Sequence, residues 1–264
     1  MRAWWLVFAT ACGFSTNPLD HKDAGHPDGP ADSRRILDVA DGSADDAVAV
    51  WEFADGSGDT VTDTGRSPPL DLTIDKPSHV AWGNSSLIIS NDVRIESAGP
   101  ATKIIDAAKA ANAITIEAWL TPANDGQVGP ARVVAVSFDA INRDVAIMQD
   151  GAMWAYRLRT TATDDNGQPD VDSGATIQVD PRRQYVVVTE DGTDRVIYVD
   201  GVEAGRDQKG GSFANWDETY TVILANDHVG TDRPWHGTLD RVAIYDRVFT
   251  ADEIMARAQA MMFR

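Results

Sequence analysis

The chain has very little cysteine and little positive charge. Cys12 is its one cysteine among 264 residues, so no internal disulfide can form, and stability has to come from core packing or a bound metal. Lysine and arginine number 23 against 41 aspartates and glutamates, which gives a formal charge of −18. That charge argues against nucleic acid as a partner and against electrostatic docking on anionic lipid, and leaves neutral and cationic partners open.

The chain also lacks an apolar run of the roughly 20 residues that a membrane-spanning helix needs. The N-terminal run Ala3 to Ala11 is short and suits the core of a secretion signal. Because it ends at the lone Cys12, it resembles the lipobox of bacterial lipoproteins, although Ala9 stands where leucine is usual. The resemblance predicts a signal peptide over residues 1–11, lipidation of Cys12, and an exported protein of the bacterial cell envelope. Gly13 after the cysteine is not the Asp that signals inner-membrane retention, so the pattern favours an outer-membrane anchor, with plain secretion as the alternative.

The segment between Cys12 and Asp46 is rich in Asp, Gly, Pro, Ala and Ser. Its apolar residues are too few to offset the entropy of ordering the chain. We therefore predict a disordered tether over residues 12–46 and a single folded domain over 47–264.

From Ala47 onward, short runs of β-branched and aromatic residues alternate with turn signals about every ten residues, which is typical of an all-β sandwich. Asp-Gly pairs at 150/151, 191/192 and 200/201 predict tight hairpins. Two helices are expected, one over residues 101–110 and one at the C-terminus, where Thr250-Ala-Asp-Glu253 forms a capping box.

The run Gly237 to Ile254, GTLDRVAIYDRVFTADEI, is similar to the closing strand and following helix of laminin G-like domains of the concanavalin A-like kind. Val50 to Phe53, Ile114 to Leu120, Tyr185 to Thr189 and Tyr198 to Gly201 agree with the same family in order. The resemblance implies a two-sheet antiparallel jelly-roll sandwich with a short C-terminal helix. This fold hosts lectins, adhesion modules and glycanases alike, so function has to be argued from the site.

Catalytic motifs are missing. Related glycanases carry Glu-x-Asp-x-x-Glu on one strand, and this chain has no such triplet and no Gly-x-Ser-x-Gly. Strand parity places Thr115, Glu117 and Trp119 together, either on an exposed concave face or packed under a loop. One carboxylate cannot perform two-carboxylate chemistry, so we predict that the protein is not an enzyme.

Asp240 is a candidate buried acid, because alternation along its strand places it on the core face with Val242 and Ile244. A buried carboxylate is costly unless hydrogen bonds or a cation satisfy it. Either backbone amides do so, or Asp240 binds a structural Ca²⁺ together with Asp63 of the 55–63 loop, as the resemblance implies.

Two loops combine aromatic and polar residues, the combination that binds sugars. The candidate ligand contacts are Trp216, Asn226, Asp227, Trp235 and His236. The alternative is that Trp235 and His236 pack against the closing strand.

We therefore expect an exported lipoprotein whose non-catalytic, lectin-like domain binds a carbohydrate or a glycosylated surface, with Ca²⁺ as a structural cofactor. The alternatives are a domain that binds another envelope protein, and an enzyme of unfamiliar mechanism.

Overall fold

The computed structural model describes residues 46–262 except 176, 229 and 231. The predicted signal peptide, Cys12 and residues 12–45 of the predicted tether lie outside these described residues. None of the helices in the described part is both long enough and apolar enough to cross a membrane.

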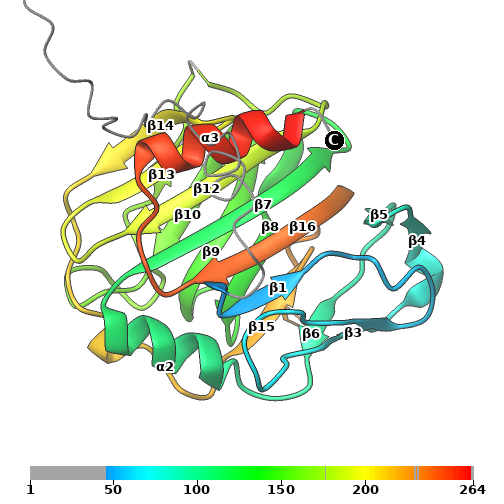
Figure 1. Ribbon diagram of the computed structural model, residues 1–264, viewed down its shortest axis with the longest axis horizontal. Coiled ribbons are helices and arrows are strands. Elements are labelled where there is room, and N and C mark those ends of the chain that lie inside the picture. Colours follow the sequence, from blue (N-terminus) through cyan, green and yellow to red (C-terminus); the bar gives the residue numbers. More distant parts are fainter. Residues whose placement is uncertain (1–45, 176, 229, 231, 263–264) are drawn as a thin grey trace, which may run out of the picture. The chain divides into compact units, whose positions relative to one another are not determined.

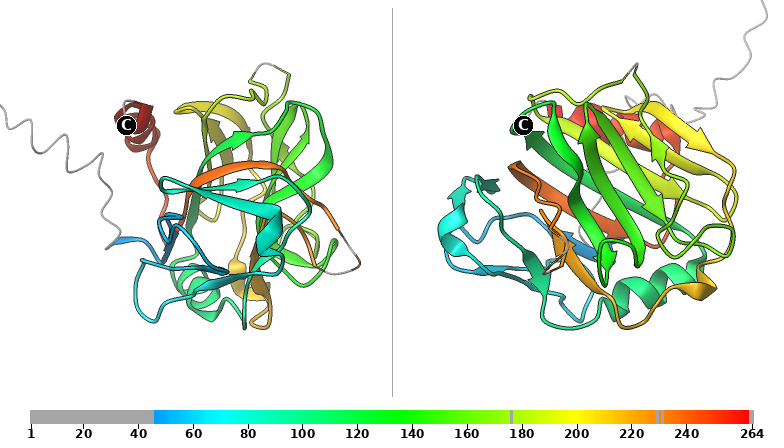
Figure 2. Two further views of the ribbon diagram at one scale, coloured as in Figure 1. Left: turned by 90° about the vertical axis from the view of Figure 1, so that its right-hand side faces the viewer. Right: turned by 180° about the vertical axis from the view of Figure 1, so that it is seen from behind.

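Two eight-stranded antiparallel sheets face each other (Figures 1 and 2). Sheet A runs β14-β13-β12-β7-β16-β5-β4, with β1 also paired to β16. Its strands are β1 (Ala49–Trp51), β4 (Val80–Gly83), β5 (Ser86–Ile89), β7 (Ile114–Pro122), β12 (Gln184–Glu190), β13 (Arg195–Val199), β14 (Val202–Asp207) and β16 (Gly237–Tyr245). Sheet B runs β11-β10-β9-β8-β15-β6-β3-β2. Its strands are β2 (Thr60–Val61), β3 (Leu72–Ile74), β6 (Ile95–Ser97), β8 (Gln127–Ser137), β9 (Arg143–Gly151), β10 (Met153–Leu158), β11 (Val171–Asp172) and β15 (Thr221–Leu224).

Within the described residues, two α-helices accompany the sheets, α2 (Thr102–Ala111) and α3 (Ala251–Met262), with 3-10 turns η2 (Pro77–His79) and η3 (Phe213–Asn215). The capping box forms in part, because the Glu253 amide donates to Thr250 Oγ1 at 3.2 Å. In Figure 1, α3 lies across the outer face of sheet A over β12, β13 and β14. The jelly-roll sandwich with a short C-terminal helix is thus confirmed.

The predicted hairpins at the Asp-Gly pairs are present. Asp200 and Gly201, between β13 and β14, both have positive φ, 53° and 87°. The left-handed backbone that this tight turn requires explains the Asp-Gly sequence.

Alternation on β7 also holds. Ile116, Ala118 and Leu120 belong to the core between the sheets, whereas Trp119 belongs to a second apolar cluster under α3. Glu117 and Trp119 are both buried, so this half of the outer face is covered and not an exposed concave surface.

The parity prediction for Asp240 is wrong because β16 contains a β-bulge. Leu239 pairs with Leu120 and Arg241 pairs with Trp119, so Asp240 is one extra residue between consecutive partners. A bulge redirects the side chains around it. The Asp240 carboxylate consequently points away from the core and meets Arg183 on the outer face of sheet A.

Candidate functional site

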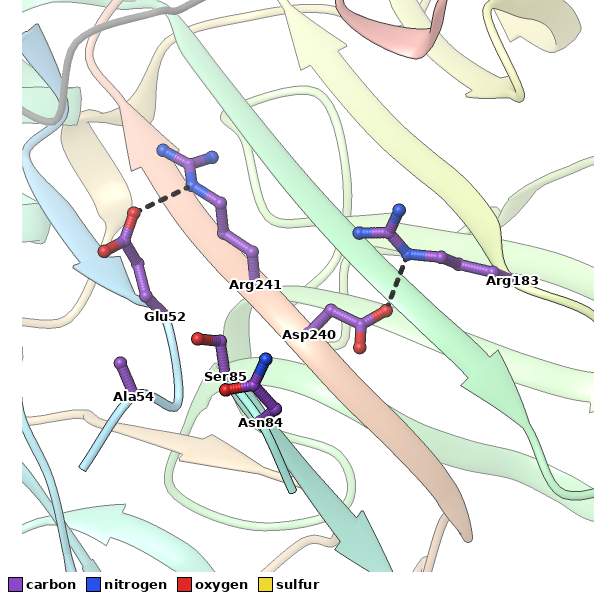
Figure 3. Close-up of a pocket in the computed structure, with 7 residues that line it drawn as sticks. All are labelled: Glu52, Ala54, Asn84, Ser85, Arg183, Asp240 and Arg241. Carbon is purple, nitrogen blue, oxygen red and sulfur yellow. Dashed lines mark hydrogen bonds and ion pairs between the residues drawn. The ribbon is translucent and has the colours of Figure 1, made fainter. Parts of the chain in front are cut away.

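The outer face of sheet A is hollowed beyond the part that α3 covers. A pocket of about 550 Å³ opens there, and we call it the Asp240 pocket (Figure 3). It is lined by Glu52, Ala54, Asn84, Ser85, Arg183, Asp240 and Arg241.

Four separate chain segments bring these side chains together. Glu52 follows β1 directly, and Asn84 and Ser85 form the turn between β4 and β5, where Ser85 has φ 54°. Arg183 immediately precedes β12, and the bulge of β16 supplies Asp240. The pocket therefore depends on tertiary pairing of distant strands, and no short sequence motif encodes it.

Two acid–arginine pairs set the electrostatics of the Asp240 pocket. Arg183 Nε donates to Asp240 Oδ2 at 2.8 Å, and Arg241 Nε lies 3.8 Å from Glu52 Oε1. The Arg183 guanidinium also lies over the Trp119 ring, 4.6 Å from its centroid. Balanced charges and fixed donors and acceptors suit a ligand rich in hydroxyl groups.

An apolar hollow of about 460 Å³ lies beside Gly237 and Thr238, the residues of β16 that come before Asp240. This hollow, the Ile88 hollow, is lined by Ile88, Ile89, Ser90, Thr121, Pro122, Ala123, His236, Gly237 and Thr238. Predicted residue His236 is thus at an open surface, where its Nε2 lies 3.2 Å from Asp92 Oδ1. Polar and apolar linings thus follow one another along β16.

The predicted aromatic contacts are buried. Trp216 is 3% exposed, stacks on Phe213 at 4.9 Å and donates from Nε1 to the Arg159 carbonyl. Trp235 is fully buried, and its Nε1 donates to Gln149 Oε1 at 3.0 Å. The prediction that these rings stack on sugar is therefore wrong, because their loops fold inward and complete the core.

Asn226 and Asp227 are also fully buried, so they do not line an open pocket as predicted. Asn226 Oδ1 accepts the amides of Asp227 and Arg233 at 2.8 and 2.7 Å. Asp227 Oδ2 lies 3.3 Å from Arg132 Nε. Both side chains organise the loop that follows β15.

Asp63 is a hydrogen-bonded structural acid. Its Oδ1 accepts the amides of Val50 and Gly65, and its Oδ2 accepts the Leu70 amide and the Lys103 ammonium at 2.6 Å. A cation at Asp63 would have to displace Lys103.

Asp240 is matched with Arg183 and not with Asp63. Over residues 46–262, apart from the three omitted positions, no three His, Cys, Asp or Glu side chains gather as metal ligands would. Calcium at Asp63 and Asp240 stays a prediction, and these contacts count against it.

Glu117 is buried within a polar cluster beneath α3. It accepts hydrogen bonds from Tyr185 Oη at 2.5 Å and Tyr245 Oη at 3.0 Å, and it pairs with Arg241 and Arg257. This fits the packed alternative for Glu117. We call this group the Glu117 cluster.

Sequence reasoning missed Glu52, Asn84, Arg183 and Arg241. Arg241 stands inside the Gly237 to Ile254 run and Glu52 inside the Val50 to Phe53 run, and the family resemblance of these runs assigns no role to either side chain. Asn84 and Arg183 have no local signal, because only the arrangement of β4, β5 and β12 in one sheet brings them to the pocket.

Comparison with solved structures gives matches of similar fold. The binding domain of botulinum neurotoxin DC in complex with SialylT has a TM-score of 0.58 and 11% identity, covering 83% of this chain and 52% of that one. A botulinum neurotoxin type C structure, described as depending on two ganglioside molecules for cell entry, has a TM-score of 0.58 and 11% identity over 86% and 53%. Trypanosoma rangeli sialidase in complex with sialic acid has 0.57 and 14% over 81% and 33%.

This chain spans about half of those toxin chains and a third of the sialidase, and at these identities the likeness concerns the fold alone. Comparison with curated protein sequences gives no match. Residues 97–255, more than half of the chain, match a laminin G model described as the concanavalin A-like lectin/glucanases superfamily. The chain belongs to this laminin G-like family of the concanavalin A-like superfamily.

Proposed function

We propose that the domain is a non-catalytic recognition module that binds a carbohydrate or glycoconjugate in the Asp240 pocket. The observation that carries the proposal is the fixed Asp240–Arg183 pair in an open polar pocket, followed along β16 by the Ile88 hollow. A sugar presents hydroxyl groups at its edges and C–H groups on its faces, which matches this division. The ligands of the structural neighbours, sialic acid for the sialidase and gangliosides for the type C neurotoxin, support the same ligand class.

A catalytic role for the Asp240 pocket is less well supported than a binding role. Glycoside hydrolysis commonly uses two carboxyl groups that flank one bond, one as acid and one as base or nucleophile. The acids of the Asp240 pocket are Glu52 and Asp240, and each faces an arginine. This arrangement suits binding of a neutral or zwitterionic group better than proton transfer.

We also propose that the protein is exported and anchored in the cell envelope. The sequence pattern ending at Cys12 supports export and lipid anchoring in a bacterial envelope, with the domain presented to glycans at the cell surface. Labelling with a radioactive fatty acid, compared between the wild type and Cys12→Ser, tests the anchor.

A glycan-array screen of the purified protein, followed by titration calorimetry, tests the binding. We expect Arg183→Gln and Asp240→Asn to weaken binding of the best glycan at least tenfold. The matched control is Arg182→Gln, because Arg182 pairs with Asp180 and Asp200 and does not line the pocket. Absence of any glycan hit, or equal affinity in all variants, would contradict the proposal.

A protein-binding role is the second candidate, and one observation favours it. Phe138 and Ile141, in the turn between β8 and β9, are 63% and 64% exposed. Asp139 holds this turn by accepting the amides of Ile141 and Asn142. Exposed apolar side chains on a fixed turn are typical of protein contacts. A partner that binds wild type and not a Phe138→Ser, Ile141→Ser variant would support this role.

A further inference from the structure

The outer face of sheet B carries three arginines above a floor of small residues. Arg157 of β10 pairs with Ala146, Arg132 of β8 with Met148, and Arg143 of β9 with Ser137. Paired residues share a face of the sheet, and this face also holds the small apolar cluster of Ala135, Ala146, Met148, Ala155 and Ile223. Three guanidinium groups therefore gather on one face of a chain whose formal charge is −18.

Two of these arginines have acidic partners. Arg157 makes two hydrogen bonds to Asp170, at 2.7 and 3.1 Å, and Arg132 Nε lies 3.3 Å from Asp227 Oδ2. Arg143 differs from both. Its Nη2 donates to the Ala140 carbonyl, while its Nε and Nη1 are buried and have no hydrogen-bond partner.

The Arg143 side chain is fully buried, so water does not satisfy these groups. Burying a charge without a partner is costly, and proteins normally neutralise it. Burial lowers the pKa of Arg132 to about 9, with the nearby Arg143 charge acting in the same direction, and burial lowers the pKa of Arg143 to about 10. The charges of Asp227, Asp139 and Asp170 oppose the effect of burial on the pKa of Arg143, yet none of these carboxylates accepts a hydrogen bond from its Nε or Nη1.

We propose that Arg143 is the centre of an anion site that receives one compact oxyanion, a carboxylate or a phosphate group. The unpartnered N–H groups at Nε and Nη1 supply charge-assisted hydrogen bonds, for which guanidinium is well suited. Arg132 and Arg157 add to the positive potential from the neighbouring strands.

Access runs past the β8–β9 turn. Arg143 follows this turn directly and bonds to its Ala140 carbonyl, and the turn carries the exposed Phe138 and Ile141. Because the guanidinium is fully buried in the structure, anion binding requires this turn to move away from Arg143. The site is on the opposite sheet from Asp240, so it does not depend on the proposed glycan pocket.

Thermal unfolding of the full protein with added anions tests the site. The probes are sodium phosphate and sodium glucuronate, compared with sodium chloride at equal ionic strength. We expect one probe to raise Tm saturably, by about 3 °C near ten times its apparent Kd. A response to phosphate identifies the phosphate class, and a response to glucuronate identifies the carboxylate class.

Arg143→Met should abolish the rise while leaving Tm in chloride unchanged or higher, because it removes a buried charge whose Nε and Nη1 have no hydrogen-bond partner. Arg206→Met is the matched control, since Arg206 forms an exposed pair with Glu203, and it should retain the rise. If Arg143→Met does not fold, Arg143→Lys should fold and weaken the response about tenfold. Two outcomes overturn the proposal. One is a rise in Arg143→Met or Arg143→Lys equal to that of the wild type. The other is no rise in the wild type with either probe up to about 50 mM, a concentration at which a site with a Kd of about 5 mM is mostly filled. Asp240→Asn should respond like the wild type.

Discussion

The outer face of sheet A holds two groups of acid and arginine that are alike in composition and opposite in exposure. In the Glu117 cluster, the carboxylate is 1% exposed and contacts two tyrosine hydroxyls and two arginines. In the Asp240 pocket, the side chain of Asp240 is 21% exposed and bonds to Arg183. The difference follows from α3, which covers one part of the face. The same chemistry is thereby structural on one side and available to a ligand on the other.

Arg241 connects the two groups. It bonds to Glu117 beneath α3 and lies 3.8 Å from Glu52 at the wall of the Asp240 pocket. A recognition side chain that is held by a buried network loses little freedom on binding. The covered cluster therefore pre-organises one wall of the open pocket.

The largest expected effect comes from breaking the covered cluster. Glu117→Ala leaves Arg241 and Arg257 buried without their shared anion, and we expect the free energy of unfolding to fall by about 3–5 kcal/mol. Urea denaturation of the wild type and variant measures it. Glu218→Ala, which removes an exposed partner of Lys109, should change stability by less than about 0.5 kcal/mol. A loss below about 1 kcal/mol for Glu117→Ala would show that the cluster is not structural.

Asp63 is buried like Glu117, but its carboxylate is satisfied mostly by backbone amides. Asp63→Ala removes the acceptor of three amides and leaves Lys103 without its carboxylate, so we expect a loss of about 2–4 kcal/mol. The same melts in calcium and in EDTA test the metal prediction. If calcium raises Tm in the wild type and not in Asp63→Asn, a cation replaces Lys103 and the structural assignment of Asp63 is incomplete.

Buried acids with fewer partners give a pH dependence. Asp144 Oδ2 and Glu190 Oε2 are buried without a hydrogen-bond partner, and burial raises the pKa of each group to about 8. An unfolded carboxyl titrates near pH 4, so between about pH 5 and 8 the folded state holds protons that the unfolded state has released. Stability should therefore fall as pH rises, by up to about 1.4 kcal/mol per pH unit for each group.

Urea melts at pH 5, 6, 7 and 8 measure this slope. The double variant Asp144→Asn, Glu190→Gln should flatten it, and Asp240→Asn should leave it unchanged. His228 adds a smaller effect of the same sign, because Glu96 raises its pKa against the opposing effect of burial, and that stabilisation is lost as pH rises. An unchanged slope in the double variant would contradict the assignment to these two carboxyls.

The sequence predicted the features of this molecule that are encoded locally. Asp200-Gly201 encodes a turn, Thr250 to Glu253 encodes a helix start, and the alternation in Ile114 to Leu120 encodes a half-buried strand. Each depends on neighbours within a few residues, which is why each was confirmed.

The site could not be predicted in the same way. The bulge at Asp240 depends on how β16 pairs with β7, and one extra residue reverses the parity argument. Trp235 follows a polar loop in the sequence, yet it fills the core because the chain turns inward there. Both errors come from reading a tertiary property, pairing or burial, from local composition.

The smallest effect on stability is expected at the open Asp240 pocket. Asp240→Asn keeps the shape of the side chain and removes one partly exposed ion pair, so the free energy of unfolding should change by less than about 0.5 kcal/mol. Glu117→Gln, the same chemical change in the covered cluster, should cost several times more because two buried arginines lose their anion. Parallel urea melts of the two variants measure the ratio. If Asp240→Asn costs as much as Glu117→Gln, then Asp240 serves the fold, and loss of glycan binding in that variant would no longer identify it as a ligand contact.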